Sequence, residues 1–400
     1  MALLFRDLKS ILYFFYRRYL AIRPKLEYFK LWLEKRLNLV AKLPGSLVPK
    51  YFFLVIMLAY QGIKYRAIEM SSSSKNVGSS SFTNLLNLCK FSAFQMYGIV
   101  SSTTLFPFKY PKQIYLSTAS TRGLSSPNIA CLAAGLPHFS TNYMRCWGRD
   151  VCISLRGMFL LSGHFDQARA HIIAFGSTLK HGLIPNLLDQ GIKPRYNARD
   201  AAWWWLLAVA EYCRLSDEGT AFLGVEVARR FVPCRRYTRG ENYGRDYDIA
   251  YENAHADEFI EPSHPLAYSY TNTIAELCHE ILERHARGIH FREWNAGPNL
   301  DHAMSQIGFD IDICTLWEND IGFVSGGSKM NCGTWMDKMG DSVKAKNKGF
   351  PATPRDGADI EIVGLLKSFL NWIVNDLIDK VPHWKWNHVT KGNKSLIFMG

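Results

Sequence analysis

The sequence lacks the short motifs that mark several common enzyme classes. None of its 12 histidines forms an H-x-x-x-H or H-E-x-x-H pattern, so no metal site is expected. No G-x-S-x-G string is present, which disfavours a nucleophilic serine. The nine cysteines include no C-x-x-C pair, which indicates neither a zinc ribbon nor a disulfide framework. We therefore expect no cofactor, and a reducing compartment, the cytoplasm, as the location.

Long apolar runs are also scarce. The uncharged stretch 51–60 is only ten residues long, whereas a membrane-spanning helix needs about 20, so we expect a buried core helix there. Residues 1–43 alternate apolar pairs with basic residues near helical spacing, without a clean signal peptide. This pattern favours a surface helix of the fold over a basic amphipathic helix lying on a membrane, which stays open as the alternative. Membrane association is accordingly not expected.

Acidic residues are few near the N-terminus. Residues 1–100 contain 15 Lys/Arg and 4 Asp/Glu, so they carry +11 of the net charge of +12. The rest of the chain is almost neutral, and the basic character belongs to an N-terminal arm. Because no RNA- or DNA-binding motif accompanies this charge, nucleic acid is not expected as the ligand.

The composition, 48% hydrophobic and 20% charged, is that of a globular protein. We divide the chain into a basic segment of helices and loops, 1–128, and a helical domain, 129–400. In the second part, long helices alternate with short polar loops, and Asp150, Asp166 and Asp200 stand where they could cap three of these helices. The run 271–287 is amphipathic. This pattern predicts an all-α domain whose loops meet at one face.

Four loops combine an aromatic residue with a carboxylate, amide or guanidinium group: 137–150, 194–205, 290–301 and 331–340. A sugar pocket needs this combination, because aromatic faces pack on the C–H face of a sugar and planar polar groups bind its hydroxyls. A plain capping role for Asp150 and Asp200 stays open. Trp203, Trp204 and Trp205 are interpreted as core, since three consecutive helical residues point in different directions.

Several strings of the sequence are highly specific. They are AAGLPHF (133–139), RCWGRD (145–150), LKHGLIPNLL (179–188), RYNARDAAWWWL (195–206), GIHFREWNAGP (288–298), NCGTWMDKMG (331–340) and PATPRDGADIEIVGLLKS (351–368). Through these strings the chain resembles the eukaryotic glycogen debranching enzymes, in their C-terminal amylo-α-1,6-glucosidase region. The likeness is dense over 130–210 and 285–370, and weak over 214–284.

The resemblance implies an (α/α)6 toroid, of the six-hairpin glycosidase type. It also implies inverting hydrolysis of the α-1,6-linked glucose at glycogen branch points, which needs two carboxyl groups. Asp337 matches the general acid. Flanking Trp335 and Met336 could desolvate it, and desolvation keeps a carboxyl group protonated.

By the same likeness, Arg149 and Asp150 would hold the outer hydroxyls of the terminal glucose, and Trp147 would form part of the floor. The further substrate-binding candidates are Tyr196, Asn197, Arg199, Asp200, Glu293, Asn295 and Trp335. We expect these side chains to gather at one mouth of the toroid, with glycogen or a branched α-glucan as the partner.

Two parts of the family pattern are missing. The transferase half is absent, so transferase activity does not follow. The family's second carboxylate, a Glu near its C-terminus, is also absent, and Glu361 is too close to the segment of the acid to replace it. We therefore expect an incomplete toroid that is either poorly soluble alone or completed by a partner, and that releases little free glucose. The alternative is a non-catalytic glycogen-binding or assembly protein without the general base.

Overall fold

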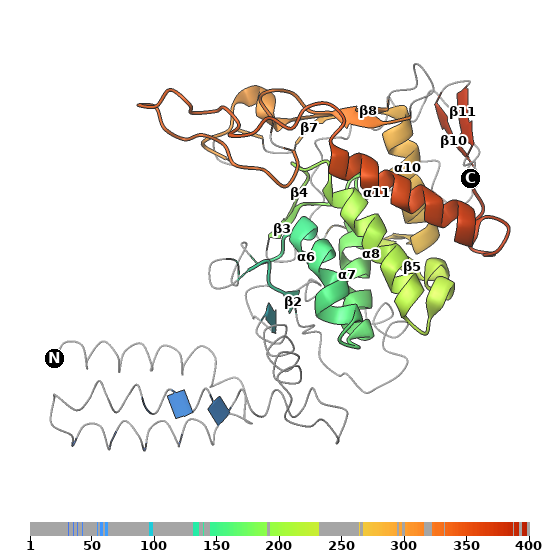
Figure 1. The fold of residues 1–400 in the computed structure, drawn as a ribbon, viewed down its shortest axis with the longest axis horizontal. Coiled ribbons are helices and arrows are strands. Elements are labelled where there is room, and N and C mark those ends of the chain that lie inside the picture. The colour runs from blue at the N-terminus through green and yellow to red at the C-terminus, as the bar shows by residue number, and fades with distance from the viewer. Residues whose placement is uncertain are drawn as a thin grey trace. The chain divides into compact units, whose positions relative to one another are not determined.

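The computed structural model describes most of residues 131–397 and a few earlier ones. The described ranges are 131–135, 145–189, 193–231, 267–293, 301–315, 322–331, 333–386, 388–391 and 394–397, with single residues or short pieces elsewhere. The chain divides into two compact units, Met1–Ser92 and Ala93–Gly400. The second unit contains nearly all of the described residues (Figure 1). The predicted domain boundary at residue 128 lies outside them and stays a prediction.

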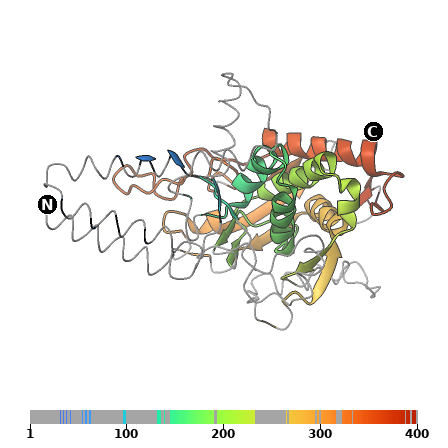
Figure 2. The same ribbon diagram turned by 90° about the horizontal axis from the view of Figure 1, so that it is seen from below.

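The described part of the second unit is built around five α-helices. They are α6 (Gly148–Leu155), α7 (Phe165–Ser177), α8 (Ala201–Leu215), α10 (Ile274–Arg287) and α11 (Ile360–Trp372). α6 and α11 each continue into a π-helical turn, at Arg156–Leu160 and Ile373–Leu377. Helix α8 is central, because it packs against α6, α7 and α11, while α10 packs against α7 (Figures 1 and 2).

Five small antiparallel sheets accompany the helices in the described residues. Four are two-stranded: β1 (Tyr97–Gly98) with β2 (Cys131–Leu132), β3 (Leu187–Asp189) with β4 (Lys193–Arg195), β5 (Glu226–Arg229) with β6 (Tyr270–Thr273), and β10 (His388–Lys391) with β11 (Lys394–Ile397). The fifth joins β7 (Ile289–Arg292), β8 (Asp310–Thr315) and β9 (Val324–Gly326). The all-α prediction therefore holds only in part: helices form the core, but short hairpins border it.

Two helices begin earlier than their predicted caps. α6 begins at Gly148, directly after Trp147, so Asp150 lies in its first turn and is not the N-cap. α7 begins at Phe165, and Asp166 also lies in the first turn. The capping assignments of both aspartates are therefore wrong. A carboxylate in the first turn still stabilises the helix, because it faces the positive end of the helix dipole.

Helix α8 begins where the sequence predicted, with Asp200 at the N-cap position. Its side chain, however, makes no capping hydrogen bond to the helix. The sequence AAWWWLLAVAEYCRL contains no Gly or Pro and is rich in Ala and Leu, which favours a helix without help from a cap. The carboxylate of Asp200 is therefore available for another partner.

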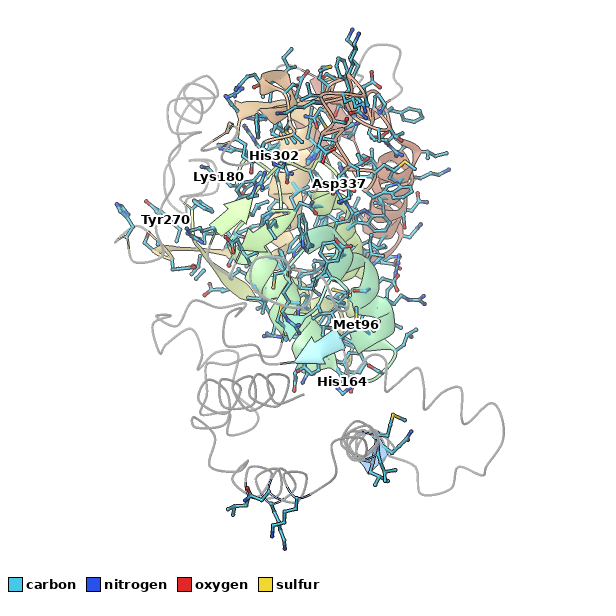
Figure 3. The ribbon with its side chains drawn as sticks, turned by 90° about the vertical axis from the view of Figure 1, so that its left-hand side faces the viewer. Met96, His164, Lys180, Tyr270, His302 and Asp337 are labelled. Carbon is cyan, nitrogen blue, oxygen red and sulfur yellow. The ribbon has the colours of Figure 1, made fainter. Side chains whose placement is uncertain are left out.

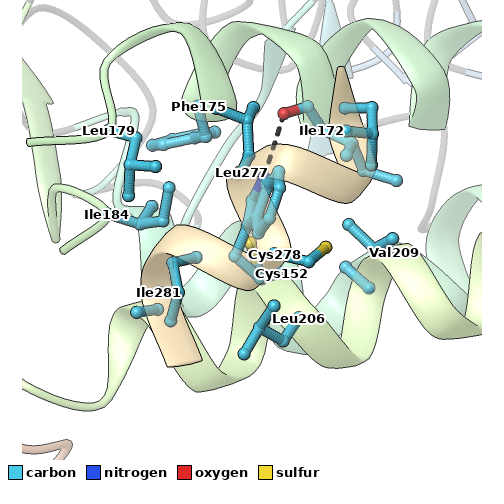
Figure 4. Close-up of a cluster of buried hydrophobic side chains, with 14 of the residues drawn as sticks. Cys152, Ile172, Phe175, Leu179, Ile184, Leu206, Val209, Leu277, Cys278 and Ile281 are labelled. Atoms are coloured by element: carbon cyan, nitrogen blue, oxygen red, sulfur yellow. Dashed lines mark hydrogen bonds between the residues drawn. The ribbon is translucent and has the colours of Figure 1, made fainter. Parts of the chain in front are cut away.

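The core lies between α7, α8 and α10 and consists mainly of apolar side chains (Figure 4). Trp203 and Trp205 are fully buried in it and Trp204 is half-buried, which confirms the interpretation of these residues as core. The indole Nε1 of Trp205 donates to the backbone carbonyl of Ile172 at 2.9 Å, so the ring is buried without losing its hydrogen bond.

The apolar run 51–60 belongs to the first unit. Leu54, Met57 and Leu58 are helical, as predicted, but they are 56%, 38% and 63% exposed. The prediction of a buried core helix is therefore wrong for these residues, which lie outside the buried cluster of the second unit. No described helix is both long enough and apolar enough to cross a membrane. The Ser-rich stretch 71–81, whose composition is typical of a surface loop, lies outside the described residues.

Removing the cap of α10 should destabilise the protein measurably. The hydroxyl of Thr273 accepts from the backbone N–H of Glu276 at 3.2 Å, and the Glu276 carboxylate accepts from the N–H of Thr273 at 2.8 Å. We expect Thr273→Ala to lower the free energy of unfolding by about 1 kcal/mol in urea denaturation. Thr273→Ser keeps the hydroxyl and should lose much less; equal losses for both variants would contradict the capping role.

Candidate functional site

The site begins with the turn that leads into α6. Trp147 forms an antiparallel bridge with Leu187, and the N–H of Gly148 donates to the carbonyl of Asn186 at 2.6 Å. A Cβ atom on Gly148 would lie 2.3 Å from the carbonyl oxygen of Pro185, so only glycine allows this close approach. The R-C-W-G-R-D string therefore fixes where α6 starts, and with it the direction of Arg149.

Arg149 and Asp200 form a buried bidentate ion pair between the starts of α6 and α8. The Nε and Nη2 atoms of Arg149 donate to the two carboxylate oxygens of Asp200 at 2.6 and 2.9 Å. The Asp200 side chain is fully buried and that of Arg149 is 6% exposed. Burial alone would lower the pKa of Arg149. The negative charge of Asp200 and its hydrogen bonds outweigh burial, so the pKa of Arg149 is raised.

Asp337 is the third member of this cluster. Its Oδ2 atom lies 3.4 Å from Nη1 of Arg149, the guanidinium nitrogen that Asp200 leaves free. The Asp337 side chain is 30% exposed, so the carboxylate is open to an incoming molecule. Lys338 Nζ lies 3.5 Å from its other oxygen, Oδ1. Figure 3 shows Asp337 at the boundary between the green helices and the orange loop segment.

Asp150 completes a group of three carboxylates around Arg149. Desolvation raises the pKa of Asp150 and Arg149 opposes this rise, while the negative charges of Asp337 and Asp200 add to it. Asp150 lies on the exposed side of α6. The structure thus brings Arg149, Asp150, Asp200 and Asp337 together, although Asp337 is 188 residues from Arg149 in the sequence.

Glu293 and Tyr196 form a second, buried pair. Glu293 follows β7, and its Oε1 atom accepts from the backbone N–H of Tyr196 at 2.9 Å and lies 3.6 Å from Nε of Arg195. Its Oε2 atom is buried and has no hydrogen-bond partner among the described residues. Burial raises the pKa of Glu293. The hydroxyl of Tyr196 donates to the carbonyl of Thr178 at 2.5 Å, so this side chain is already bonded within the fold.

Arg199 lies next to Asp200 in the chain but is bonded to a different segment. Its Nη2 donates to Asp359 Oδ2 at 2.6 Å and to the carbonyl of Arg355, and its Nη1 donates to the carbonyl of Gly357 at 3.0 Å. The backbone N–H of Arg199 also donates to Gly333. Arg199 therefore holds the 355–359 segment against the loop that carries Asp337.

Asn197 and Arg199 line a small cavity of about 10 Å³, bordered also by Asn331 and Gly333. The Asn197 Oδ1 and Arg199 Nε atoms are buried without a hydrogen-bond partner among the described residues. The cavity is large enough for one water molecule and far too small for a sugar.

Arg355 was not among the candidates from the sequence, although it lies in the quoted P-A-T-P-R-D string. Its guanidinium donates to Asp359 at 3.2 Å and to Glu361, and its Nη1 atom lies 3.3 Å from the Met336 sulfur. It also lies over the ring of Trp335, 5.9 Å from the centroid. Arg355 thus contacts both residues that precede Asp337.

The two residues that precede Asp337 are partly exposed. Trp335 is 52% exposed and Met336 is 36% exposed. Arg355 contacts both of them, and the expected desolvation of Asp337 by this pair stays a prediction. Trp147 is half-buried and makes an edge-to-face contact with Phe139 at 6.3 Å. Asn295 lies outside the described residues.

The cluster offers acid–base and hydrogen-bonding chemistry. No group of three or more His, Cys, Asp or Glu side chains suited to a metal ion occurs in the described part of the chain. A planar guanidinium has two parallel N–H donors and a carboxylate has two acceptor oxygens. Arg149 and the carboxylates around it can therefore each bind two neighbouring sugar hydroxyls.

The buried carboxyl of Glu293 should make stability depend on pH. Its pKa is raised above the ordinary value of 4.5, so its favourable contribution is present below about pH 4.5 and is lost as the pH rises through the folded-state value. In the Glu293→Gln variant, the side-chain amide cannot ionise, and its oxygen can still accept from the Tyr196 N–H. The unfolding free energy of this variant minus that of the wild type should therefore increase with pH, by at most about 1.4 kcal/mol per pH unit.

Urea denaturation from about pH 4.5 to 7.5 measures this difference. The exposed Asp356→Asn variant is the control and should show no comparable slope. A flat profile for Glu293→Gln would show that burial does not perturb this carboxyl group.

The sequence matches the protein-family model described as Amylo-alpha-1,6-glucosidase over residues 108–395, which is more than half of the chain. The chain belongs to the amylo-alpha-1,6-glucosidase family. Its region 108–395 is thus a glycoside hydrolase domain, and the resemblance stated from the sequence motifs is confirmed. The family implies a six-hairpin glycosidase fold, and the described residues form helices bordered by small sheets.

A glycogen debranching enzyme of the yeast Saccharomyces cerevisiae is 47% identical over 343 residues. These residues make up 86% of the chain but only 19% of the yeast protein, so the chain spans about a fifth of the length of this relative.

Proposed function

We propose that this member of the amylo-alpha-1,6-glucosidase family hydrolyses the α-1,6-linked glucose at glycogen branch points, with inversion at the anomeric carbon. The observation that carries the proposal is the cluster of Arg149, Asp200 and Asp337. Three segments far apart in the sequence meet there, around one guanidinium and beside an accessible carboxylate. Glycogen, or another branched α-glucan, is the proposed partner.

Asp337 is the proposed general acid, which protonates the bridging oxygen as the glucose leaves. Two features support this role. Its carboxylate is 30% exposed, so the oxygen of a bound glucan can reach it. The guanidinium of Arg149 is held beside it by the bidentate contact with Asp200, so the two charged groups of the site keep a fixed arrangement.

Arg149 and Asp150 are proposed to bind the hydroxyls of the terminal glucose, with Trp147 as part of the floor. Trp335, which Arg355 contacts, offers exposed ring surface for a second sugar. Tyr196, Asn197, Arg199, Asp200, Glu293 and Asn295 stay in the proposal as the surrounding wall. Among them, the contacts of Arg199, Asp200 and Tyr196 within the protein support an indirect part, in which they hold the binding residues in place.

The proposed architecture is the (α/α)6 toroid of six-hairpin glycosidases, with this site at its mouth. The β3–β4 hairpin, which the Trp147–Leu187 bridge joins to the start of α6, is consistent with loops that build one rim.

Inversion also requires a base that deprotonates water, normally about 6.5–9.5 Å from the acid. Glu361 accepts a hydrogen bond from Arg355, and Glu293 accepts from the backbone of Tyr196. Each glutamate thus has one carboxylate oxygen that is hydrogen-bonded within the fold. This observation favours the second candidate function, a glycogen-binding or assembly protein that keeps the sugar pocket without the base, and it predicts slow hydrolysis for the 400-residue chain.

Glucose release from a branched substrate tests the proposal. The chain is incubated with a phosphorylase-limit dextrin and, separately, with a linear α-1,4 maltooligosaccharide, and glucose is measured together with its anomeric form. The expected result is slow release from the branched substrate only, with the β-anomer formed first. Binding of the dextrin without any release would favour the second candidate, and release from the linear substrate would contradict the proposed linkage.

A further inference from the structure

Two buried cysteines lie next to each other where the chain approaches the site. The Sγ atoms of Cys131, in β2, and Cys146, directly before Trp147, are 2.8 Å apart. Both residues are fully buried, and both are free thiols. Neither takes part in the proposed hydrolysis.

Neighbouring hydrogen bonds fix the backbone on both sides of the pair. The guanidinium of Arg145 donates to the carbonyl of Cys131, and the N–H of Leu132 donates to Nε2 of His171 at 3.0 Å. On the other side, the N–H of Leu188 donates to the carbonyl of Cys146 at 3.0 Å. The two thiols therefore face each other because β2 and the start of α6 are held there.

The surroundings also activate one of the two thiols. Burial opposes ionisation of Cys131, but the hydrogen bond with Cys146 and the nearby positive charge of Arg145 favour the thiolate, and the pKa of Cys131 is lowered. The pKa of Cys146, in contrast, is raised. Since the thiolate is the nucleophile in thiol oxidation, the pair consists of one reactive sulfur and one resolving sulfur.

We propose that Cys131 and Cys146 form a reversible oxidation site that closes to a disulfide when a peroxide is the oxidant. Cys131 Sγ attacks one oxygen of hydrogen peroxide, the O–O bond breaks, and the products are a sulfenic acid on Cys131 and water. Cys146 Sγ then attacks the sulfenic sulfur, and the second water leaves. Two thiols and one peroxide thus give one disulfide and two water molecules.

Oxidation at this site would tie β2 to the segment that begins α6. The disulfide closes the loop between residues 131 and 146, which removes conformational freedom from the unfolded chain. The melting temperature of the oxidised protein should therefore rise by about 5 °C, and a thiol reductant should reverse the rise.

Peptide mapping tests the proposal directly, because trypsin cleaves between the two cysteines. Cleavage after Arg122, Arg145 and Arg149 leaves Cys131 in the peptide 123–145 and Cys146 in the peptide 146–149, CWGR. The chain is treated with hydrogen peroxide, free thiols are alkylated, and the unreduced digest is examined by mass spectrometry. The expected result is a linked 123–145/146–149 species that disappears on reduction.

The variants Cys131→Ser and Cys146→Ser should each abolish this species and the shift in melting temperature. Cys152→Ser is the matched control: Cys152 is equally buried, burial raises its pKa, and its loss should leave the linked species unchanged. Exposed Met336 serves as an internal measure of oxidant dose through its sulfoxide.

If both peptides carry only alkylated thiols at a dose that oxidises Met336, or if either cysteine pairs elsewhere, the proposal is overturned. The wild-type digest decides this even if a serine variant fails to fold. None of these measurements depends on glucan hydrolysis, so the outcome is separate from that of the proposed function.

Discussion

Replacing Asp200 with alanine is expected to lower the free energy of unfolding by about 3–5 kcal/mol. The carboxylate is fully buried and its two oxygens accept from Nε and Nη2 of Arg149. Its removal leaves a guanidinium that is 6% exposed without its main counter-charge. The loss is large because the remaining charge must either stay desolvated or pull water into the start of α6.

Equilibrium denaturation in urea at neutral pH measures this effect. Asp200→Asn keeps the shape of the side chain but not its charge, and it should lose a large part of the same free energy. Asp217→Ala, an exposed aspartate beyond the other end of α8, is the matched control and should change stability by less than about 0.5 kcal/mol. A loss below 1 kcal/mol for Asp200→Ala would show that water already screens the pair.

The same substitution should also disturb Asp337. Without Asp200, the Arg149 guanidinium, whose Nη1 atom lies 3.4 Å from Asp337 Oδ2, loses the bidentate contact that fixes its position. Asp200 therefore has a second role in the proposed mechanism, since it positions Arg149 beside Asp337. The sequence suggested a cap or a sugar ligand at position 200, and neither suggestion included this positioning role.

Local strings in the sequence predicted that helices begin near Asp150 and after Asp200. The second start is where α8 begins, after Asp200 at the N-cap position. The first is displaced by two residues, because α6 begins at Gly148. The approximate start of a helix depends on a few neighbouring residues, which a sequence displays directly.

Long-range contacts explain what the sequence did not predict. The bridge between Trp147 and Leu187 moves the start of α6 ahead of Asp150, and no local pattern reveals it. The contacts of Arg199 with the 355–359 segment join residues about 160 positions apart. Likewise, Arg355 contacts Met336 from 19 residues further along the chain and also lies over the ring of Trp335. In each case the deciding partner lies in another part of the chain.

Asp337→Asn is expected to reduce glucose release from a branched α-glucan by at least about 10²-fold, the low end of what general acid–base catalysis contributes. The amide has nearly the same size and can still accept a hydrogen bond from Nη1 of Arg149, so the surrounding contacts should persist. It cannot, however, deliver a proton to the bridging oxygen. The glucan chain that carries this oxygen would then have to leave as an alkoxide.

The control is Asp341→Asn, a change of the same chemistry at an exposed position four residues further along the chain. This variant should release glucose at the wild-type rate. The affinity for a phosphorylase-limit dextrin, measured by co-sedimentation, should change less than about twofold for both variants, because the proposed sugar contacts lie on Arg149 and Asp150. Equal rates for the wild type and Asp337→Asn would contradict the role of Asp337 as the acid.

A substrate with a better leaving group separates proton donation from other effects of the Asp337→Asn change. Departure of fluoride from α-glucosyl fluoride needs little protonation, so the variant should hydrolyse it with a much smaller loss than it shows on the branched glucan. An equal loss on both substrates would mean that Asp337 acts by orienting Arg149 or water. The search for the missing base would then turn to Asp337 itself, together with Glu293 and Glu361.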